Sequence, residues 1–421
     1  MKISIQSVKL CDDRSPWHLK EVNVSIEDGV ITSIGTEQSK GQGTVIDGRG
    51  KWLTIGWFDM WAHLCDPGLE HKENLDSGRS AAVAGGFTGV AVLPNTQPVT
   101  ESKSALSYIT KGNEDHVVAL YPLAAVTKET AGHEIAEMLD LEAHGAVAFT
   151  DGLKPVTHTD VIVKSLQYLQ KVNGLFIQRP EDTDLTLYGN VHEGPVSTSL
   201  GLKGMPALAE ELIIQRDLEL LKYAGGKMHF ANISSAGSVN LIRKAKGAGL
   251  NVTCDVTSFQ LLFNDVEVLP FDTNYKVNPP FRSTDDVEAL YDGIKDGTID
   301  AIVSAHNPQD EECKKLEFDL ADFGVISLQT VGANLASMSA LVPLEVLLKK
   351  VTTTPREILG LEVPAIETGS LAELTLFDPR EEWLFNSHSN YSKSENSPFF
   401  GQRLTGKASA VIRGKKYWYD Q

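Results

Sequence analysis

The chain of 421 residues contains little cysteine. Its four cysteines are scattered, and no two of them form a C-x-x-C pair: Cys11, Cys65, Cys254 and Cys313. So few cysteines in so long a chain cannot form a disulfide framework, and their spacing excludes zinc ribbons and thioredoxin-like redox motifs. This pattern suits a reducing compartment, and we expect a cytoplasmic protein.

Long apolar runs and an excess of basic residues are also lacking. No stretch approaches the ~20 apolar residues of a membrane span. The first residues alternate between apolar and polar types, unlike the apolar segment of a secretory signal. The formal net charge is −18, and an acidic surface repels phosphate backbones. We therefore expect neither a membrane nor a nucleic acid as partner.

Both ends of the chain have the period-two pattern of half-buried strands. Val24–Ile26 and Val30–Thr32 flank the turn Glu27–Gly29, as in a hairpin. Residues 372–377 and 410–415 give the same pattern near the C-terminus. We predict that residues 1–52 and 369–421 together form one small β-sandwich domain. The polar stretch 381–405 is interpreted as a long surface loop.

The middle of the chain, residues 53–368, has a different rhythm. Short apolar runs alternate with amphipathic stretches, of which 207–223 and 239–248 are the clearest helices. Buried apolar strands separated by helices indicate a parallel sheet covered on both faces. About eight such units in this length predict a (β/α)₈ TIM barrel, hence an α/β protein.

Several collinear motifs resemble the dihydroorotases, a family of the amidohydrolase superfamily. The segment 56–68 resembles the family's G-x-x-D-x-H-x-H-x-R-x-P-G motif, and 93–98, 200–206 and 275–282 follow at the family's spacing. The resemblance covers nearly the whole chain and implies an amidohydrolase-type barrel. It also implies the reversible closure of carbamoyl-aspartate to dihydroorotate in pyrimidine biosynthesis, with zinc activating a water molecule.

The site positions that the resemblance implies depart from this pattern. Only His63 and Asp151 remain as metal ligands. The other four ligand positions carry Trp61, Arg179, Asn232 and Ala305. An indole offers no lone pair to a metal, and a guanidinium is a permanent cation that repels zinc.

The catalytic carboxylate is lost as well, because Ala305 stands at the acid/base position, so no catalytic residue is expected. The substrate-binding positions retain Asn95 and Asn278, but Cys65 replaces an arginine and Gln309 replaces a histidine. His63 is interpreted as a hydrogen-bonded core histidine, and His229 and His306 occupy non-ligand positions. Asp151 is expected to cap a loop or to pair with Arg179.

Three functions remain open. The first is a catalytically inactive dihydroorotase homologue with a structural or regulatory role, whose candidate partner is aspartate carbamoyltransferase and which needs no cofactor. The second is an active dihydroorotase or related cyclic amidohydrolase with an atypical zinc site. The third is a sensor of a pyrimidine precursor. A homo-oligomer is expected in each case.

Overall fold

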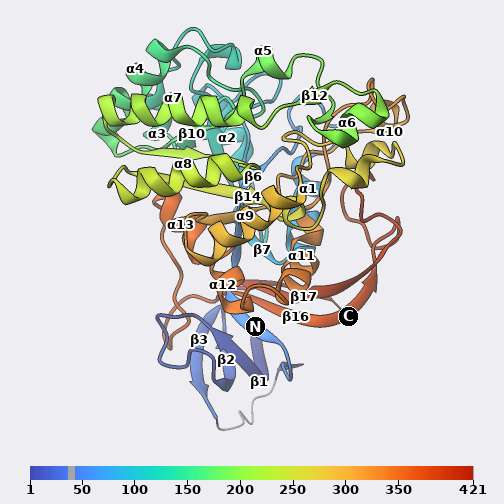
Figure 1. The fold of residues 1–421 in the computed structure, drawn as a ribbon. Coiled ribbons are helices and arrows are strands. Elements are labelled where there is room, and N and C mark those ends of the chain that lie inside the picture. Colours follow the sequence, from blue (N-terminus) through green and yellow to red (C-terminus); the bar gives the residue numbers. More distant parts are fainter. Residues whose placement is uncertain (37–42, 421) are drawn as a thin grey trace.

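In the described part of the chain, the strands divide between two eight-stranded sheets and a small two-stranded one; Figure 1 shows the arrangement of these elements. The computed structural model describes residues 1–36 and 43–420. Within this part of the chain, no helix is long and apolar enough to cross a membrane.

One large sheet contains eight parallel strands in chain order. They are β6 (Trp57–Ala62), β7 (Phe87–Val92), β8 (Ala119–Ala124), β9 (Ala148–Phe149), β10 (Phe176–Gln178), β13 (Met228–Phe230), β14 (Val252–Thr257) and β15 (Ala301–Val303). Ala62 forms a parallel bridge with His306, and the His63 amide donates to the His306 carbonyl at 2.8 Å. These contacts bring the first and last strands together, and the predicted barrel is confirmed.

Helices surround the barrel. The described helices that follow its strands are α1 (Leu75–Ala84), α2 (Lys103–Thr110), α3 (Met138–Glu142), α4 (Thr159–Leu169), α7 (Leu208–Ala224), α8 (Ala236–Gly247), α9 (Thr284–Lys295), α11 (Val331–Met338), α12 (Leu344–Lys349) and α13 (Thr353–Leu359). Every residue of β6 and β7 is buried, because helices cover the outer face of the sheet and side chains fill its interior. Both helices expected from the sequence are present, as α7 and α8.

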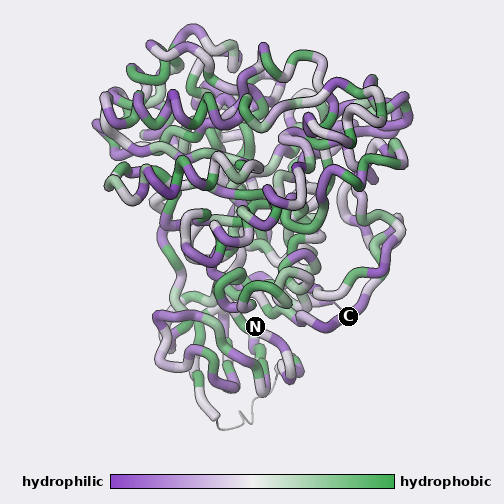
Figure 2. The backbone as a smooth tube through the Cα atoms, in the orientation of Figure 1, coloured by the Kyte–Doolittle hydropathy of each residue, from purple (hydrophilic) through white to green (hydrophobic). Residues whose placement is uncertain are grey.

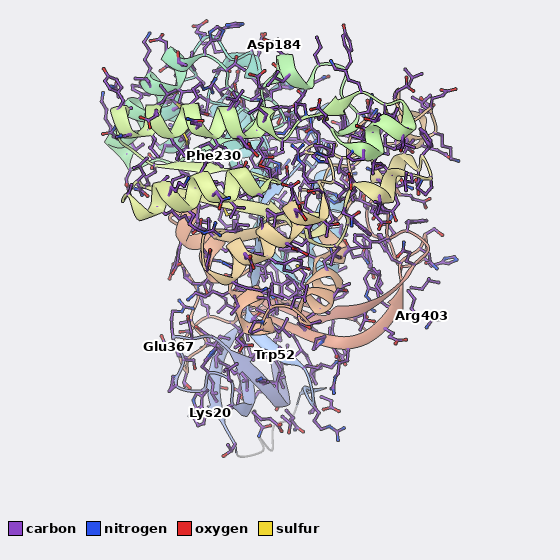
Figure 3. The ribbon with its side chains drawn as sticks, viewed as in Figure 1. Lys20, Trp52, Asp184, Phe230, Glu367 and Arg403 are labelled. Atoms are coloured by element: carbon purple, nitrogen blue, oxygen red, sulfur yellow. The ribbon has the colours of Figure 1, made fainter. Side chains whose placement is uncertain are left out.

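Smaller elements lie in the loops that follow β10 and β15. They are α5 (Thr183–Thr186), β11 (Val191–His192), α6 (Pro195–Leu200), β12 (Gly204–Met205) and α10 (Glu311–Lys314). Because the strands are parallel, all loops that follow their carboxyl ends meet at one face of the barrel. Asp184 of α5 lies at the opposite end of the molecule from Lys20 (Figure 3).

The second large sheet combines the two ends of the chain. Its strands are β1 (Lys2–Cys11), β2 (Glu21–Glu27), β3 (Val30–Gly35), β4 (Thr44–Asp47), β5 (Trp52–Ile55), β16 (Glu373–Leu384), β17 (Arg403–Arg413) and β18 (Lys416–Tyr419). Strand β5 joins the two halves, since it pairs with β1 on one side and with β16 on the other. Apolar segments lie inside both units, and polar ones lie mainly at the periphery (Figure 2).

The polar stretch near the C-terminus differs from its prediction as a surface loop. Its two ends are strand, because β16 and β17 pair from Glu382↔Thr405 to Leu384↔Arg403. The intervening residues also cover part of the barrel. Ser394 donates to the Lys72 carbonyl at 2.8 Å and the Asn396 amide donates to the Asn307 carbonyl at 3.1 Å. The polar composition of this stretch suggested that it is exposed to solvent. The side chains of Ser394 and Asn396 can nevertheless be buried, because they form hydrogen bonds with the backbone of the barrel loops.

Candidate functional site

A cavity of about 300 Å³ opens at the carboxyl ends of the barrel strands. Its lining includes one residue from each of the four altered ligand positions: Trp61, Arg179, Asn232 and Ala305. Strands β6, β10, β13 and β15 therefore bring these positions together, as the sequence motifs require. What differs is the chemistry that the side chains offer there.

Trp61 fills space inside the barrel. It lies on β6 with 3% of its surface exposed, and it belongs to the apolar cluster that contains Phe58, Leu93 and Ile177. Its ring therefore acts as a core side chain that also forms a wall of the cavity.

His63 is buried beside the cavity and hydrogen-bonded within the protein. Its Nε2 donates to the Asn95 carbonyl at 2.9 Å, so Nε2 carries the hydrogen. Nδ1 lies 3.3 Å from Asn307 Oδ1 and 3.6 Å from the Cys65 thiol. Burial lowers the pKa of the His63 imidazole and raises the pKa of the Cys65 thiol to about 12. Both ring nitrogens of His63 therefore have partners within the protein, on Asn95 and on Asn307.

Asp151 is held by the loop that follows β8. Its carboxylate accepts from the backbone N–H of Thr127 at 2.9 Å and also from the Thr127 hydroxyl. Burial raises the pKa of Asp151, although the Thr127 hydrogen bonds oppose this shift. Asn95 fixes the loop after β9, which contains Asp151: its side chain donates to the Asp151 carbonyl at 3.0 Å and accepts from the Leu153 N–H at 2.9 Å. Asp151 and Asn95 therefore make contacts within the protein. The resemblance implied instead that Asp151 binds a metal and that Asn95 binds the substrate.

Arg179 forms a buried ion pair with Glu181 rather than with Asp151. Its Nη2 lies 2.9 Å from Glu181 Oε2, and its Nη1 donates to the Leu153 carbonyl. Of the two alternatives expected for Asp151, the pairing with Arg179 is wrong, because Glu181 lies two residues from Arg179 and the Asp151 oxygens accept from Thr127. Asn278 donates to both Glu181 oxygens, at 3.3 and 3.2 Å.

The Glu181 carboxylate is favoured in its ionised form. Burial acts to raise its pKa, but the charge of Arg179 and the hydrogen bonds from Thr186 and Asn278 outweigh burial and hold the pKa below its ordinary value. A guanidinium–carboxylate pair thus occupies the part of the cavity that the family resemblance assigns to a metal ligand.

His229 and Asn232 share one acidic partner, Asp255 on β14. His229 Nε2 lies 2.8 Å from Asp255 Oδ2, and the Asn232 backbone N–H donates to Asp255 Oδ1 at 2.6 Å. His229 and Asp255 are fully buried. His229 therefore positions the turn after β13, as its non-ligand place in the motif implies. Asn232 has φ of 57°, a left-handed conformation that asparagine tolerates better than most residues.

His306 is enclosed by hydrogen bonds that sequence reasoning did not identify. Its Nδ1 accepts from the Ser327 backbone N–H at 3.1 Å, so Nε2 carries the hydrogen and lies 3.4 Å from Glu73 Oε2. Glu73 also accepts from the Ser77 and Ser392 hydroxyls. Glu73 and His306 are far apart in the sequence, and nothing in the local pattern indicated that they meet.

Gln309 is also engaged by its surroundings. Its Oε1 accepts from Lys72 Nζ at 2.6 Å, and its Nε2 donates to the Phe323 carbonyl at 2.9 Å. Ala305, four residues earlier, has φ of 50°, which is a strained conformation for alanine.

The residues present do not fit a catalytic zinc site. Catalytic zinc usually takes three protein ligands and a water molecule. Within residues 1–36 and 43–420, no group of three or more His, Cys, Asp or Glu side chains is placed to hold a metal ion. The two retained ligands, His63 and Asp151, direct their polar atoms to Asn95 and Thr127.

Comparisons with known proteins agree with this architecture. The L-hydantoinase (dihydropyrimidinase) of Arthrobacter aurescens superposes with a TM-score of 0.84 at 20% identity, covering 99% of this chain and 96% of that one. A D-hydantoinase superposes with a TM-score of 0.82 at 22% identity, covering 100% and 97%. The fold is therefore the amidohydrolase-type barrel with a terminal β-domain.

Sequence relatives define the family more narrowly. The family described as "Dihydro-orotase-like" matches residues 50–238. A dihydroorotase of Pelotomaculum thermopropionicum is 40% identical over 400 residues, covering 94% of this chain and 93% of the relative. One of Citrifermentans bemidjiense is 39% identical with 94% coverage of both chains. The chain belongs to the dihydroorotase family.

Proposed function

We propose that this chain is a dihydroorotase-family protein without dihydroorotase turnover, in which protein side chains replace the metal centre. The observation that carries the proposal is the buried pair between Arg179 and Glu181 at 2.9 Å. A guanidinium at a ligand position offers no lone pair and carries a positive charge, so it opposes the binding of a dication there. The loss of a carboxylate at Ala305 adds to this, since a general acid or base typically contributes ~10²–10⁴-fold to rate.

The role that remains for such a protein is structural or regulatory. By analogy with the family, we propose a cytoplasmic homo-oligomer that binds aspartate carbamoyltransferase. Co-purification of the two proteins from the same organism, followed by size-exclusion chromatography, tests this part. Separate elution at micromolar concentration of both proteins would contradict it.

A second candidate function is dihydroorotase activity with an atypical site. It is favoured by about 40% identity to curated dihydroorotases across 94% of the chain. On this alternative, zinc supplies a nucleophilic water and polarises the substrate carbonyl. Among the described residues, His63 and Asp151 would be the ligands of this zinc. Both side chains would have to give up their present hydrogen bonds to bind it.

Metal content and turnover distinguish the two candidates. The purified protein is assayed with dihydroorotate and with carbamoyl-aspartate in excess zinc, and bound metal is measured by mass spectrometry. The dihydroorotase of P. thermopropionicum, purified identically, is the positive control. We expect substoichiometric zinc and a rate at least ~100-fold below the control. Stoichiometric zinc together with a rate near the control would establish the second candidate instead.

A further inference from the structure

We propose that a second cavity, at the face of the barrel opposite the candidate site, binds a phosphorylated ribose, as found in a ribonucleotide. The cavity has a volume of about 1010 Å³, which is sufficient for a ligand of that size. It lies between the loop that precedes β8, the segment 361–372 and the β17–β18 hairpin. Figure 3 shows Glu367 of this segment at the same end of the molecule as Lys20, away from Asp184. The inference goes beyond the proposed function, because the two cavities share no lining residue.

The β17–β18 hairpin gives this cavity three basic side chains without acidic partners. Arg413, Lys415 and Lys416 line it, and none of them forms an ion pair with a carboxylate among the described residues. Arg356 differs, because Glu373 neutralises it. Arg413 and Lys416 are directly opposite each other across the hairpin, and like charges in such positions destabilise a sheet. The chain has a formal net charge of −18, so this cluster does not reflect a general excess of basic residues. A bound anion would relieve the repulsion.

The guanidinium of Arg413 is already held in position for an oxyanion. Its Nη1 donates to the Asn113 carbonyl at 2.9 Å and to the His116 carbonyl at 3.1 Å. Its Nε and Nη2 have no partner within the described residues. These two groups form the fork of N–H donors that binds two oxygens of a carboxylate or phosphate at once. Because the side chain is fixed before the ligand arrives, binding costs less conformational entropy. Three cations around one site favour dianionic phosphate over a singly charged carboxylate.

Carboxylates in the same cavity select against a ligand that is anionic throughout. Glu114, Glu362 and Glu367 line the cavity and form no ion pair within the described residues. An ionised carboxylate only accepts hydrogen bonds, so it repels phosphate and binds hydroxyl donors. Carboxylates bind ribose hydroxyls in this way in dinucleotide sites. The Tyr121 hydroxyl also belongs to the lining and has no partner in the described part of the chain. A phosphate joined to a sugar with neighbouring hydroxyls therefore matches both kinds of group.

Ribose 5-phosphate, ribose and inorganic pyrophosphate are the probes that distinguish these contributions. Binding to the purified full chain at pH 7 is measured by isothermal titration calorimetry. We expect saturable binding of ribose 5-phosphate. Ribose lacks the anion, and pyrophosphate lacks the hydroxyls and is anionic throughout. Each should therefore bind at least about tenfold more weakly than ribose 5-phosphate.

The variant Lys416→Glu tests the location without threatening the fold. It places an opposite charge directly across from Arg413, which is a favourable cross-strand pair, so stability in urea should not fall. The new carboxylate occupies the guanidinium and repels phosphate, and the affinity for ribose 5-phosphate should fall at least about tenfold. Lys416→Arg keeps the charge and should bind like the wild type. Lys244→Glu is the matched control: Lys244 is exposed on α8 and forms no ion pair within the described residues, and its substitution should leave the affinity unchanged.

Three results would overturn the inference: no saturable binding of ribose 5-phosphate, pyrophosphate binding as tight as ribose 5-phosphate, or a Lys416→Glu variant that binds like the wild type. An equal loss of affinity in Lys244→Glu would also overturn it, because the effect would then come from net charge and not from this cavity. None of these results bears on the proposed function, which is tested by metal content and turnover.

Discussion

Replacing Glu181 by glutamine should destabilise the protein strongly, because it leaves the Arg179 guanidinium buried without its counter-charge. The two side chains are 10% and 11% exposed and lie 2.9 Å apart. Breaking a buried ion pair by removing one partner typically costs ~3–5 kcal/mol. Glutamine keeps the size of the side chain and can still accept from Thr186 and Asn278, so we expect about 3 kcal/mol at pH 7.

The double variant Arg179→Met with Glu181→Gln distinguishes the contribution of charge to stability from the contribution of packing. A buried pair replaced on both sides by uncharged groups is often nearly neutral, so the double variant should recover about 2 kcal/mol of the loss. Unfolding is measured in urea by circular dichroism. Asp160→Asn, which breaks the exposed pair with Lys164 on α4, is the control and should change little.

The pH dependence gives an independent check on the same pair. Since the folded pKa of Glu181 lies below its ordinary 4.5, its ionised form stabilises the protein above that value. This stabilisation is lost as the pH falls through the folded pKa. The difference between wild type and Glu181→Gln should therefore be full at pH 7 and shrink below about pH 4.5. Equal stability of the two proteins at pH 7 would refute the buried pair and the argument against zinc built on it.

Three further predictions concern the site and the cysteines. Trp61→His and Ala305→Asp, each alone in excess zinc, should give no substantial dihydroorotate hydrolysis, because metal-site residues act as a unit; substantial turnover from either would contradict the inactive site. Ala305→Gly should raise the free energy of unfolding in urea by up to about 1 kcal/mol, since glycine removes the strain at φ of 50°; a loss of stability would contradict that strain. Cys65 and Cys254 should not react with a thiol reagent at pH 8 until the protein is unfolded, because burial raises both thiol pKa values; peptide mapping by mass spectrometry of the native sample checks this.

The sequence was sufficient to predict the barrel fold and the protein family. Short apolar runs separated by amphipathic stretches reflect burial on both faces of a parallel sheet, and this signal is local. The sequence also shows that Trp61, Arg179 and Ala305 offer no metal ligand, because the ability to provide a lone pair depends on the side chain alone.

Only the tertiary structure decided which partners the site residues take. His306 meets Glu73 across 233 residues of sequence, and Gln309 meets Lys72 across 237. The sequence left open whether Asp151 caps a loop or pairs with Arg179, since the spacing of motifs does not show that Thr127 binds the Asp151 carboxylate. Such contacts depend on where separate loops meet above the barrel. The chain's local pattern fixes the strands that bear the loops. The mutual packing of the loops decides which buried polar atoms find a partner and which, like the Asn232 oxygen, find none within the described residues.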